Sequence, residues 1–122
     1  MTYGKTTWLI GDGFWDSHSN GLFVSHESVC VLNTSDRDAE IRMTLYFEDR
    51  EEMSGFCAVC GARRTHHIRM DKLKTEDGRT VPQDVPYAIL VESSVPVVVQ
   101  YSRLMSSQPE LGLMTTIAYP VE

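Results

Sequence analysis

Apolar and polar residues alternate with a period of two along much of this chain, and helical periodicity is nearly absent. The segment 40–47 is the clearest case, because Ile41, Met43, Leu45 and Phe47 fall on one face of an extended chain. Successive side chains of a strand point to opposite faces, so this segment is predicted to be a half-buried antiparallel strand. Residues 106–112 contain a proline and a glycine, and we expect a loop or a single turn there.

Other short segments have the composition of strands and are separated by turn residues. We predict strands over residues 6–10, 29–32, 87–91, 97–104 and 113–119, and one long strand or two over residues 56–70, where Gly61 is a bend or a bulge. Turn chemistry at residues 11–13 and 33–36 and a long loop over residues 71–86 separate them. About eight short strands predict an all-β fold, a single-domain antiparallel β-sandwich or jelly roll over residues 1–122.

Two of the predicted strands are apolar on both faces. Val97-Val98-Val99 and the run Val29-Cys30-Val31-Leu32 each present bulky side chains to both sides of a sheet. A second sheet covers one face, and a neighbouring subunit can cover the other. We therefore expect a homo-oligomer.

Polar side chains also occur where a strand built only for packing would not place them. On the predicted strand 62–70, one face carries a wholly polar row, Arg63, Thr65, His67 and Arg69. Arginine binds carboxylate and phosphate in a bidentate way, so this row suits an anionic or hydroxyl-rich ligand. The alternative is a solvent-facing surface that pairs with the acidic residues of segment 36–52.

The strand 97–104 continues from three valines into Gln100 and Arg103, which a period of two places on opposite faces. A buried polar group without a partner costs roughly 1–3 kcal/mol. We therefore expect Gln100 to satisfy a neighbouring backbone group. Arg103, near the strand end, is expected to lie at a site mouth or a subunit contact.

Ser25-His26-Glu27 places a hydroxyl, an imidazole and a carboxylate side by side. Consecutive strand residues alternate between faces, so these three cannot align as a catalytic relay. The chain also has no glycine-flanked nucleophile elbow and no phosphate-binding loop. We therefore expect no enzymatic activity. Trp8, beside the Gly11-Asp12-Gly13 turn, is either a core residue or a stacking platform for a sugar ring.

The chain has 122 residues and a net charge of −6, which argues against a dedicated nucleic-acid-binding protein. Six of the eleven basic residues lie within residues 63–79, so a local basic patch can still meet an anionic partner or simply face solvent. No apolar run approaches the roughly 20 residues that span a bilayer. The first residues lack the basic and apolar regions of a signal peptide, and we expect a cytoplasmic protein.

The three cysteines are Cys30, Cys57 and Cys60, and the last two form a CxxC pair. Zinc needs four ligands, usually with the CxxC on a tight turn, whereas side chains three apart in a strand face opposite sides. We expect ordinary thiols in a reducing compartment, with no metal and no cofactor. A zinc site with His66 and His67 and redox chemistry are the alternatives.

Five segments carry multi-residue motifs that match one known family, in the same order. They are FVSHESVCVLN (23–33), TLYFED (44–49), ARRTHHIR (62–69), SVPVVVQYSRL (94–104) and TIAY (116–119). In these motifs the chain resembles the sensory rhodopsin transducer family over nearly its whole length. The resemblance implies a small all-β fold, a homotetramer and no established enzymatic activity.

The family pattern is matched at nine candidate ligand-binding residues, namely Trp8, His26, Glu27, Arg63, Arg64, Thr65, His67, Gln100 and Arg103. Two features depart from it: Cys57 and Cys60 are not part of the pattern, and segment 11–15 differs from the Gly-aromatic-Ile-Pro stretch expected there. The best-known member of this family is a soluble cytoplasmic partner of a microbial sensory rhodopsin, and the wider group is also viewed as small-molecule-binding domains, including for sugars.

The leading hypothesis is a non-enzymatic signal-relay domain that binds a polar small molecule, such as a sugar or a sugar acid. Its site would be a concave sheet face or a subunit boundary lined by His26, Arg64, Gln100 and Arg103. The alternative is a cytoplasmic adaptor that transmits the signal of a microbial sensory rhodopsin.

Overall fold

The computed structural model describes all residues, 1–122. It contains eight strands and one short 3₁₀-helix: β1 (Lys5–Phe14), β2 (His26–Asn33), β3 (Ala39–Phe47), β4 (Met53–Cys60), β5 (Arg64–Arg69), η1 (Met70–Lys72), β6 (Pro86–Met105), β7 (Gly112–Ile117) and β8 (Tyr119–Val121). No helix in the structure has the length and hydrophobicity needed to cross a membrane.

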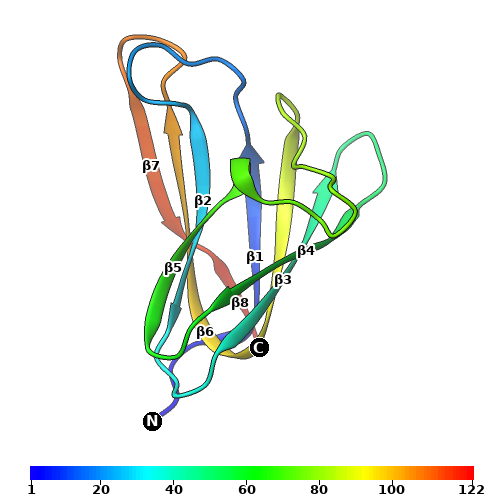
Figure 1. Cartoon of the computed structure of the whole chain (residues 1–122), viewed down its shortest axis with the longest axis vertical. Helices are drawn as coiled ribbons and strands as arrows, with labels where there is room; N and C mark the ends of the chain where they lie inside the picture. Colours follow the sequence, from blue (N-terminus) through cyan, green and yellow to red (C-terminus); the bar gives the residue numbers. More distant parts are fainter.

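The strands form the two layers of a β-sandwich (Figure 1), and every paired strand is antiparallel. One layer, here called sheet A, has the order β4-β3-β6-β1-β8. The other, sheet B, has the order β5-β2-β6-β7. Because β6 belongs to both, all eight strands form one continuous sheet that folds over itself. The predicted single-domain, all-β class is confirmed.

Strand β6 is 20 residues long and passes from one layer to the other. It pairs with β3 up to Ser93 and with β1 up to Val97, and its second half pairs with β2 and β7 from Val98 onward. The two separate strands predicted for this region are therefore one strand. Pro96 and the polar residues before it lie at the crossing, where the chain stays extended although their composition resembles that of a turn.

The core lies between the layers and follows the predicted alternation. On β3, Ile41, Met43 and Leu45 are buried, while Glu40 and Arg42 are exposed. On β2 and the second half of β6, the inward residues are likewise buried valines and a tyrosine, namely Val29, Val31, Val97, Val99 and Tyr101. This burial is the main stabilising contribution to the fold.

Several element boundaries differ from the sequence-based expectation. Strand β1 continues through Gly11 and Gly13, with a register shift between Ile10 and Gly13 that lets the chain remain paired. The segment 56–70 forms two strands, β4 and β5, joined by a turn in which Arg63 has a φ of 54°. The predicted strand 113–119 is divided into β7 and β8, which lie in different layers.

Asn33, at the end of β2, organises the turns at one end of the sandwich. It is completely buried, and its amide group donates hydrogen bonds to the carbonyl oxygens of Arg37, Cys60 and Gly61 at 2.7, 3.1 and 3.2 Å. Its side-chain oxygen accepts bonds from the backbone and hydroxyl of Ser35 at 3.0 and 2.8 Å. Asn33 thus joins the predicted turn at residues 33–36, which connects β2 with β3, to the turn that connects β4 with β5.

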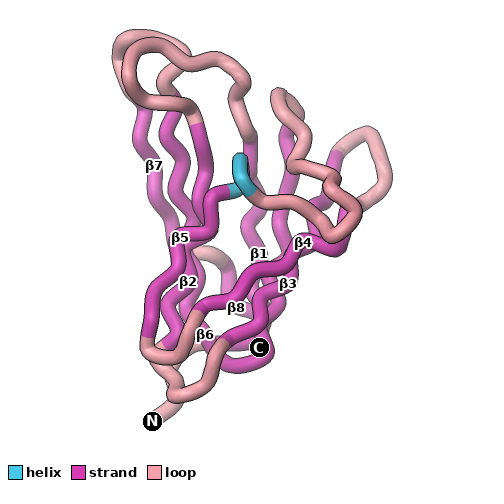
Figure 2. Tube along the Cα trace, viewed as in Figure 1, coloured by secondary structure: helices cyan, strands magenta, loops and turns pink.

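Two loops lie together at the opposite end from the chain termini (Figures 1 and 2). They are the β1–β2 connection, residues 15–25, and the β6–β7 connection, residues 106–111. The backbone N–H of Asn20 donates to the carbonyl oxygen of Ser106 at 2.6 Å, which ties the loops to each other. We call this pair of loops the tip.

Candidate functional site

A buried carboxylate, that of Glu27, lies at the centre of a polar cluster inside the sandwich. Glu27 is the second residue of β2, points inward and is 1% exposed. It accepts a 2.7 Å hydrogen bond from the backbone N–H of Phe14 and further bonds from the hydroxyl groups of Tyr87 and Tyr101. Phe14 and Tyr87 belong to sheet A, whereas Glu27 and Tyr101 belong to sheet B. The carboxylate therefore joins the two layers.

Arg103 closes this cluster on the solvent side. Its Nε lies 3.9 Å from the Glu27 carboxylate and donates to the Tyr101 hydroxyl at 3.0 Å. Its Nη2 donates to the backbone oxygen and the carboxylate of Asp12 at 3.1 and 3.3 Å. The guanidinium also stands 5.5 Å from the centre of the Tyr101 ring, a cation–π geometry. No buried side-chain nitrogen or oxygen in the protein lacks a hydrogen-bond partner.

Burial dominates the electrostatics of this cluster. It raises the pKa of Glu27 above the ordinary value of 4.5, and nearby Asp12 raises it further. Hydrogen bonds from Tyr87 and Phe14 and the charge of Arg103 act in the opposite direction. The pKa of Tyr87 is also raised, by burial first and then by the neighbouring carboxylate, so Tyr87 remains a neutral donor at physiological pH.

The polar residues expected to line one ligand site are therefore divided between two faces. Arg103 and Glu27 point inward and bind groups of their own chain. Gln100 points outward from the same strand and is exposed to solvent, and it does not bond to a neighbouring backbone group as expected. The structure does not bring His26, Arg64, Gln100 and Arg103 together.

The outer face of sheet B carries the rest of the predicted polar strand residues. His67 of β5, Cys30 of β2, Gln100 of β6 and Ile117 of β7 are cross-strand neighbours and form one row across the sheet. Thr65 lies in the next row, and its hydroxyl donates to a backbone oxygen of β2 at 3.3 Å. The side chains of Thr65, His67, Gln100 and Ile117 are exposed, and this face is of mixed polarity.

Trp8 is a core residue. It is buried, and its indole N–H is shared between the backbone oxygens of Lys5 and Val97 at 3.0 and 3.1 Å. His26, by contrast, begins β2 beside the tip and is half-buried; its Nδ1 lies 2.7 Å from the backbone oxygen of Val24. The sequence left two interpretations of Trp8, a core residue and a stacking platform for a sugar ring. The structure agrees with the first.

Arg63 and Arg64 lie at the turn between β4 and β5, and both are exposed. Because Arg63 belongs to the turn, it does not continue the polar row of β5. The Arg64 guanidinium donates to the backbone oxygens of Ala62 and Arg63 at 3.4 and 3.1 Å. No ion pair joins these arginines to the acidic segment 36–52; the ion pair on β5 is the one between Arg69 and Asp71, at 2.8 Å.

The CxxC pair follows strand geometry. Cys57 is exposed on the outer face of β4, whereas Cys60 is buried and its thiol donates to the backbone oxygens of Val31 and Arg64. Burial raises the pKa of the Cys60 thiol. The two sulfur atoms therefore face opposite sides of the strand, as predicted.

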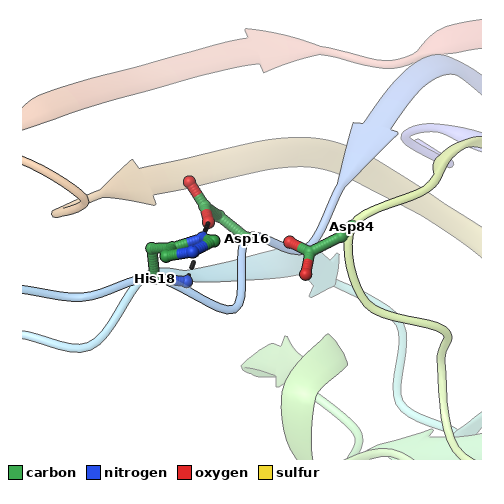
Figure 3. Close-up of side chains that lie close together, drawn as sticks. All are labelled: Asp16, His18 and Asp84. Atoms are coloured by element: carbon green, nitrogen blue, oxygen red, sulfur yellow. Dashed lines mark hydrogen bonds and ion pairs between the residues drawn. The ribbon is translucent and has the colours of Figure 1, made fainter.

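Sequence reasoning missed a loop cluster of Asp16, His18 and Asp84, whose ligand-type atoms lie within 4.8 Å of one another (Figure 3). Asp16 accepts from the backbone N–H of His18 at 2.8 Å, and its carboxylate also lies 3.1 Å from the His18 ring. Asp84 accepts from the backbone and hydroxyl of Ser17 at 2.9 and 2.5 Å, bonds that lower the pKa of Asp84. The Asp84 carboxylate thus holds Ser17, near the start of the tip, to the segment just before β6, while Asp16 bonds within its own loop. These contacts account for the cluster without an ion.

An open groove of about 400 Å³ lies between β1 and the chain that runs from β7 to the start of β8. It is lined by Leu9, Ile10, Gly11, Asp12, Met114, Thr116, Ile117, Ala118 and Tyr119. Tyr119 is an exposed aromatic ring, and Asp12 and Thr116 supply a carboxylate and a hydroxyl. An exposed ring beside hydrogen-bonding groups is the chemistry that holds sugar rings.

The chain matches one known protein family over nearly its whole length. The model of the Anabaena sensory rhodopsin transducer (ASRT) family matches residues 3–120. The chain belongs to the Anabaena sensory rhodopsin transducer family. It is a transducer-like β-sandwich domain, and the resemblance expected from its motifs is confirmed.

Two solved structures support the ASRT assignment. Thermotoga maritima 1070, known from a crystal structure, is 39% identical, with a TM-score of 0.87 over 98% of this chain and 97% of the other. The Anabaena sensory rhodopsin transducer is 38% identical, with a TM-score of 0.74 over 83% of this chain and 98% of the other. No functionally curated protein matches the chain.

For this ASRT-family domain, sequence reasoning found Glu27 and Arg103 but missed their partners. Tyr87 lies 60 residues from Glu27 in the sequence, and Asp12 lies 91 residues from Arg103. The sequence did indicate that a buried carboxylate needs hydrogen-bond donors, because burying an unpaired charge is costly. It did not indicate which residues supply those donors. The register of β6 in both layers is what brings them together.

Proposed function

We propose that this protein is a non-catalytic, cytoplasmic signal-relay adaptor that binds a membrane sensor of the sensory-rhodopsin class. The observation that carries the proposal is the family match over residues 3–120, together with a 38%-identical relative that is named a transducer. The geometry is compatible with this role, because the buried polar groups are satisfied within the chain and the exposed faces remain for partners.

A rigid sandwich can relay a signal without an internal moving part. An adaptor responds to a sensor when it binds two states of that sensor with different affinity. The Glu27 cluster supports such a role by fixing the two layers to each other, so that the surface presented to a partner keeps one shape.

The test is binding to the sensory rhodopsin for which the Anabaena relative is named, reconstituted in phosphatidylcholine nanodiscs. The full chain should bind rhodopsin nanodiscs and not empty ones, as measured by interferometry. The adaptor role fails if rhodopsin-containing and empty nanodiscs give the same response.

A second candidate function is the binding of a small polar ligand, such as a sugar or a sugar acid. The groove between β1 and β7 favours it, because the exposed ring of Tyr119 stands in the same groove as Asp12 and Thr116. A ligand present at 1 mM with a dissociation constant of 10 μM should stabilise the protein by about 2.7 kcal/mol. A thermal-shift screen of sugars and sugar acids tests this; a hit that persists in Tyr119→Ala would place the ligand elsewhere.

We also infer self-association, with a tetramer as the form that the family resemblance favours. Strand β7 is an edge strand, exposed along its whole length, with Leu113 and Ile117 on the outer face of sheet B and no lysine or proline to protect it. Leu32 of β2 continues the exposed apolar surface of that sheet. Sedimentation velocity should give an oligomer that Ile117→Lys dissociates; a monomeric wild-type protein would refute it.

A further inference from the structure

The tip presents an unusual run of apolar side chains to solvent. Leu22, Phe23 and Val24 are consecutive and are 96%, 57% and 58% exposed. With Pro109 and Leu111 of the facing loop, Leu22 and Phe23 border an open groove of about 410 Å³. Single exposed apolar residues are ordinary, but a contiguous group of this kind marks an interaction surface.

The tip is held in this conformation by a buried pair of serines. Ser25 and Ser106 are both completely buried, and their hydroxyl groups lie 3.2 Å apart. The Ser25 hydroxyl donates to the backbone oxygen of His18 at 2.8 Å, and the Ser106 hydroxyl donates to that of Phe23 at 2.6 Å. The backbone N–H of Ser106 in turn donates to the Ser25 hydroxyl at 2.8 Å.

Gly21 completes this arrangement, because it turns the chain immediately before Leu22. Its φ is +76°, a value that favours glycine, and the space around it is open. The apolar side chains are therefore exposed by a fixed backbone. Fixing a loop in its bound form reduces the entropy lost on binding, which is expected of a docking element.

The charge of the tip indicates which partner it fits. Residues 15–25 and 106–111 contain no lysine or arginine and two acids, of which Glu110 is exposed whereas the Asp16 side chain is 11% exposed and lies against His18. An anionic lipid surface attracts basic segments, so this loop pair is poorly suited to it. The loops of membrane proteins on the cytoplasmic side carry an excess of Lys and Arg, which complements an apolar surface beside the exposed carboxylate of Glu110.

We propose that the tip is the docking surface for the membrane sensor, with Leu22 and Phe23 entering an apolar depression ringed by basic residues of its cytoplasmic loops. This inference rests on the proposed adaptor function and assigns the contact to one end of the sandwich. It leaves β7 and the outer face of sheet B free for self-association.

The experiment compares the double variant Leu22→Ser/Phe23→Ser with the wild-type chain on rhodopsin nanodiscs made of phosphatidylcholine. Val59→Ser is the matched control, because Val59 is similarly exposed but lies on β4, away from the tip. The double variant should lose at least tenfold in affinity and Val59→Ser should not. Glu110→Lys should weaken binding more than Glu110→Gln does. Equal melting temperatures establish that every variant is folded.

The outcomes separate this inference from the function on which it rests. If the wild type binds and the double variant binds equally well, the tip is not the docking surface, while the adaptor function stands. If the wild type does not bind, both are refuted. Two results point to another occupant and overturn the inference: Leu22-dependent binding to empty phosphatidylserine nanodiscs, or a changed oligomeric state of the double variant in sedimentation.

Discussion

The carboxylate of Glu27 and the hydroxyl of Tyr87 meet across the sandwich, one from sheet B and the other from the part of β6 that lies in sheet A. Tyr101 and the backbone of Phe14 donate to the same carboxylate. A buried charge is tolerated when donors surround it, and here the donors come from both layers. The two layers are therefore joined by a polar contact as well as by packing.

Removing this carboxylate should be strongly destabilising. Glu27→Ala leaves two buried hydroxyl groups and one backbone N–H without an acceptor, and we expect a loss of about 3–5 kcal/mol. Glu27→Gln keeps the size and one acceptor oxygen and should cost less. Urea unfolding measures both; a loss under about 1 kcal/mol for Glu27→Ala would contradict the role given to this contact.

Stability should also depend on pH through Glu27. Its pKa is raised in the folded protein, so between the ordinary value of 4.5 and the raised value the folded state binds more protons than the unfolded state. The stability contributed by this group is therefore complete below about pH 4.5 and is lost as the pH rises through the folded pKa.

The matched measurement is urea unfolding of the wild type and of Glu27→Gln at acidic and at neutral pH. The advantage of the wild type over the variant should be larger near pH 4 than near pH 8. The lowered pKa values of Asp71 and Asp84 act in the opposite sense, but they are common to both proteins and cancel in the difference. An advantage that grows with pH would contradict the direction assigned to Glu27.

Gly13 should be sensitive to substitution because it lies against the ring of Tyr87. A Cβ at this position would stand 2.7 Å from that ring, which must then move away from Glu27. We expect Gly13→Ala to cost about 1–3 kcal/mol. Gly11→Ala is the control, since a Cβ there meets nothing within 4 Å, and its unfolding midpoint in urea should stay close to that of the wild type. Equal effects of the two substitutions would refute this explanation.

Asn33 provides a prediction at the other end of the sandwich. Its amide donates to three backbone oxygens, so Asn33→Asp would place a carboxylate against acceptors. Asn33→Ala should cost about 1–3 kcal/mol, and Asn33→Asp more at neutral pH. Lowering the pH should recover part of the loss in Asn33→Asp, because the protonated carboxyl can donate. Thermal unfolding at two pH values measures this, and a pH-independent loss would contradict it.

The strands and their faces could be predicted from the sequence wherever one side is buried and the other is not. The alternation of β3 gave Ile41, Met43 and Leu45 as core residues, and the same rule placed Gln100 and Arg103 on opposite faces. The continuity of β6 could not be predicted in this way. A strand that changes layers has polar residues and a proline at the crossing, which is also the composition of a turn.

The candidate site was predictable only in part, because the position of a polar residue in a strand does not indicate which group will be its hydrogen-bond partner. Arg103 was expected to lie at a site mouth or a subunit contact, and its partners are Tyr101 and Asp12 of its own chain. The link between Ser17 and Asp84 was also missed, since it depends on a contact between distant loops. Leu22 lies outside the matched motifs and Phe23 begins one of them, but only their solvent exposure distinguishes Leu22 and Phe23 from core residues.

The most direct test of the adaptor role is the dissociation constant of the full chain for the Anabaena sensory rhodopsin in nanodiscs, measured in the dark and under illumination. Relay of a signal requires different affinities for the two states, and coupling energies of about 1–3 kcal/mol are typical. We predict specific binding whose dissociation constant changes at least about fivefold with light. Identical dissociation constants in the dark and in the light, or no binding at all, would contradict the account.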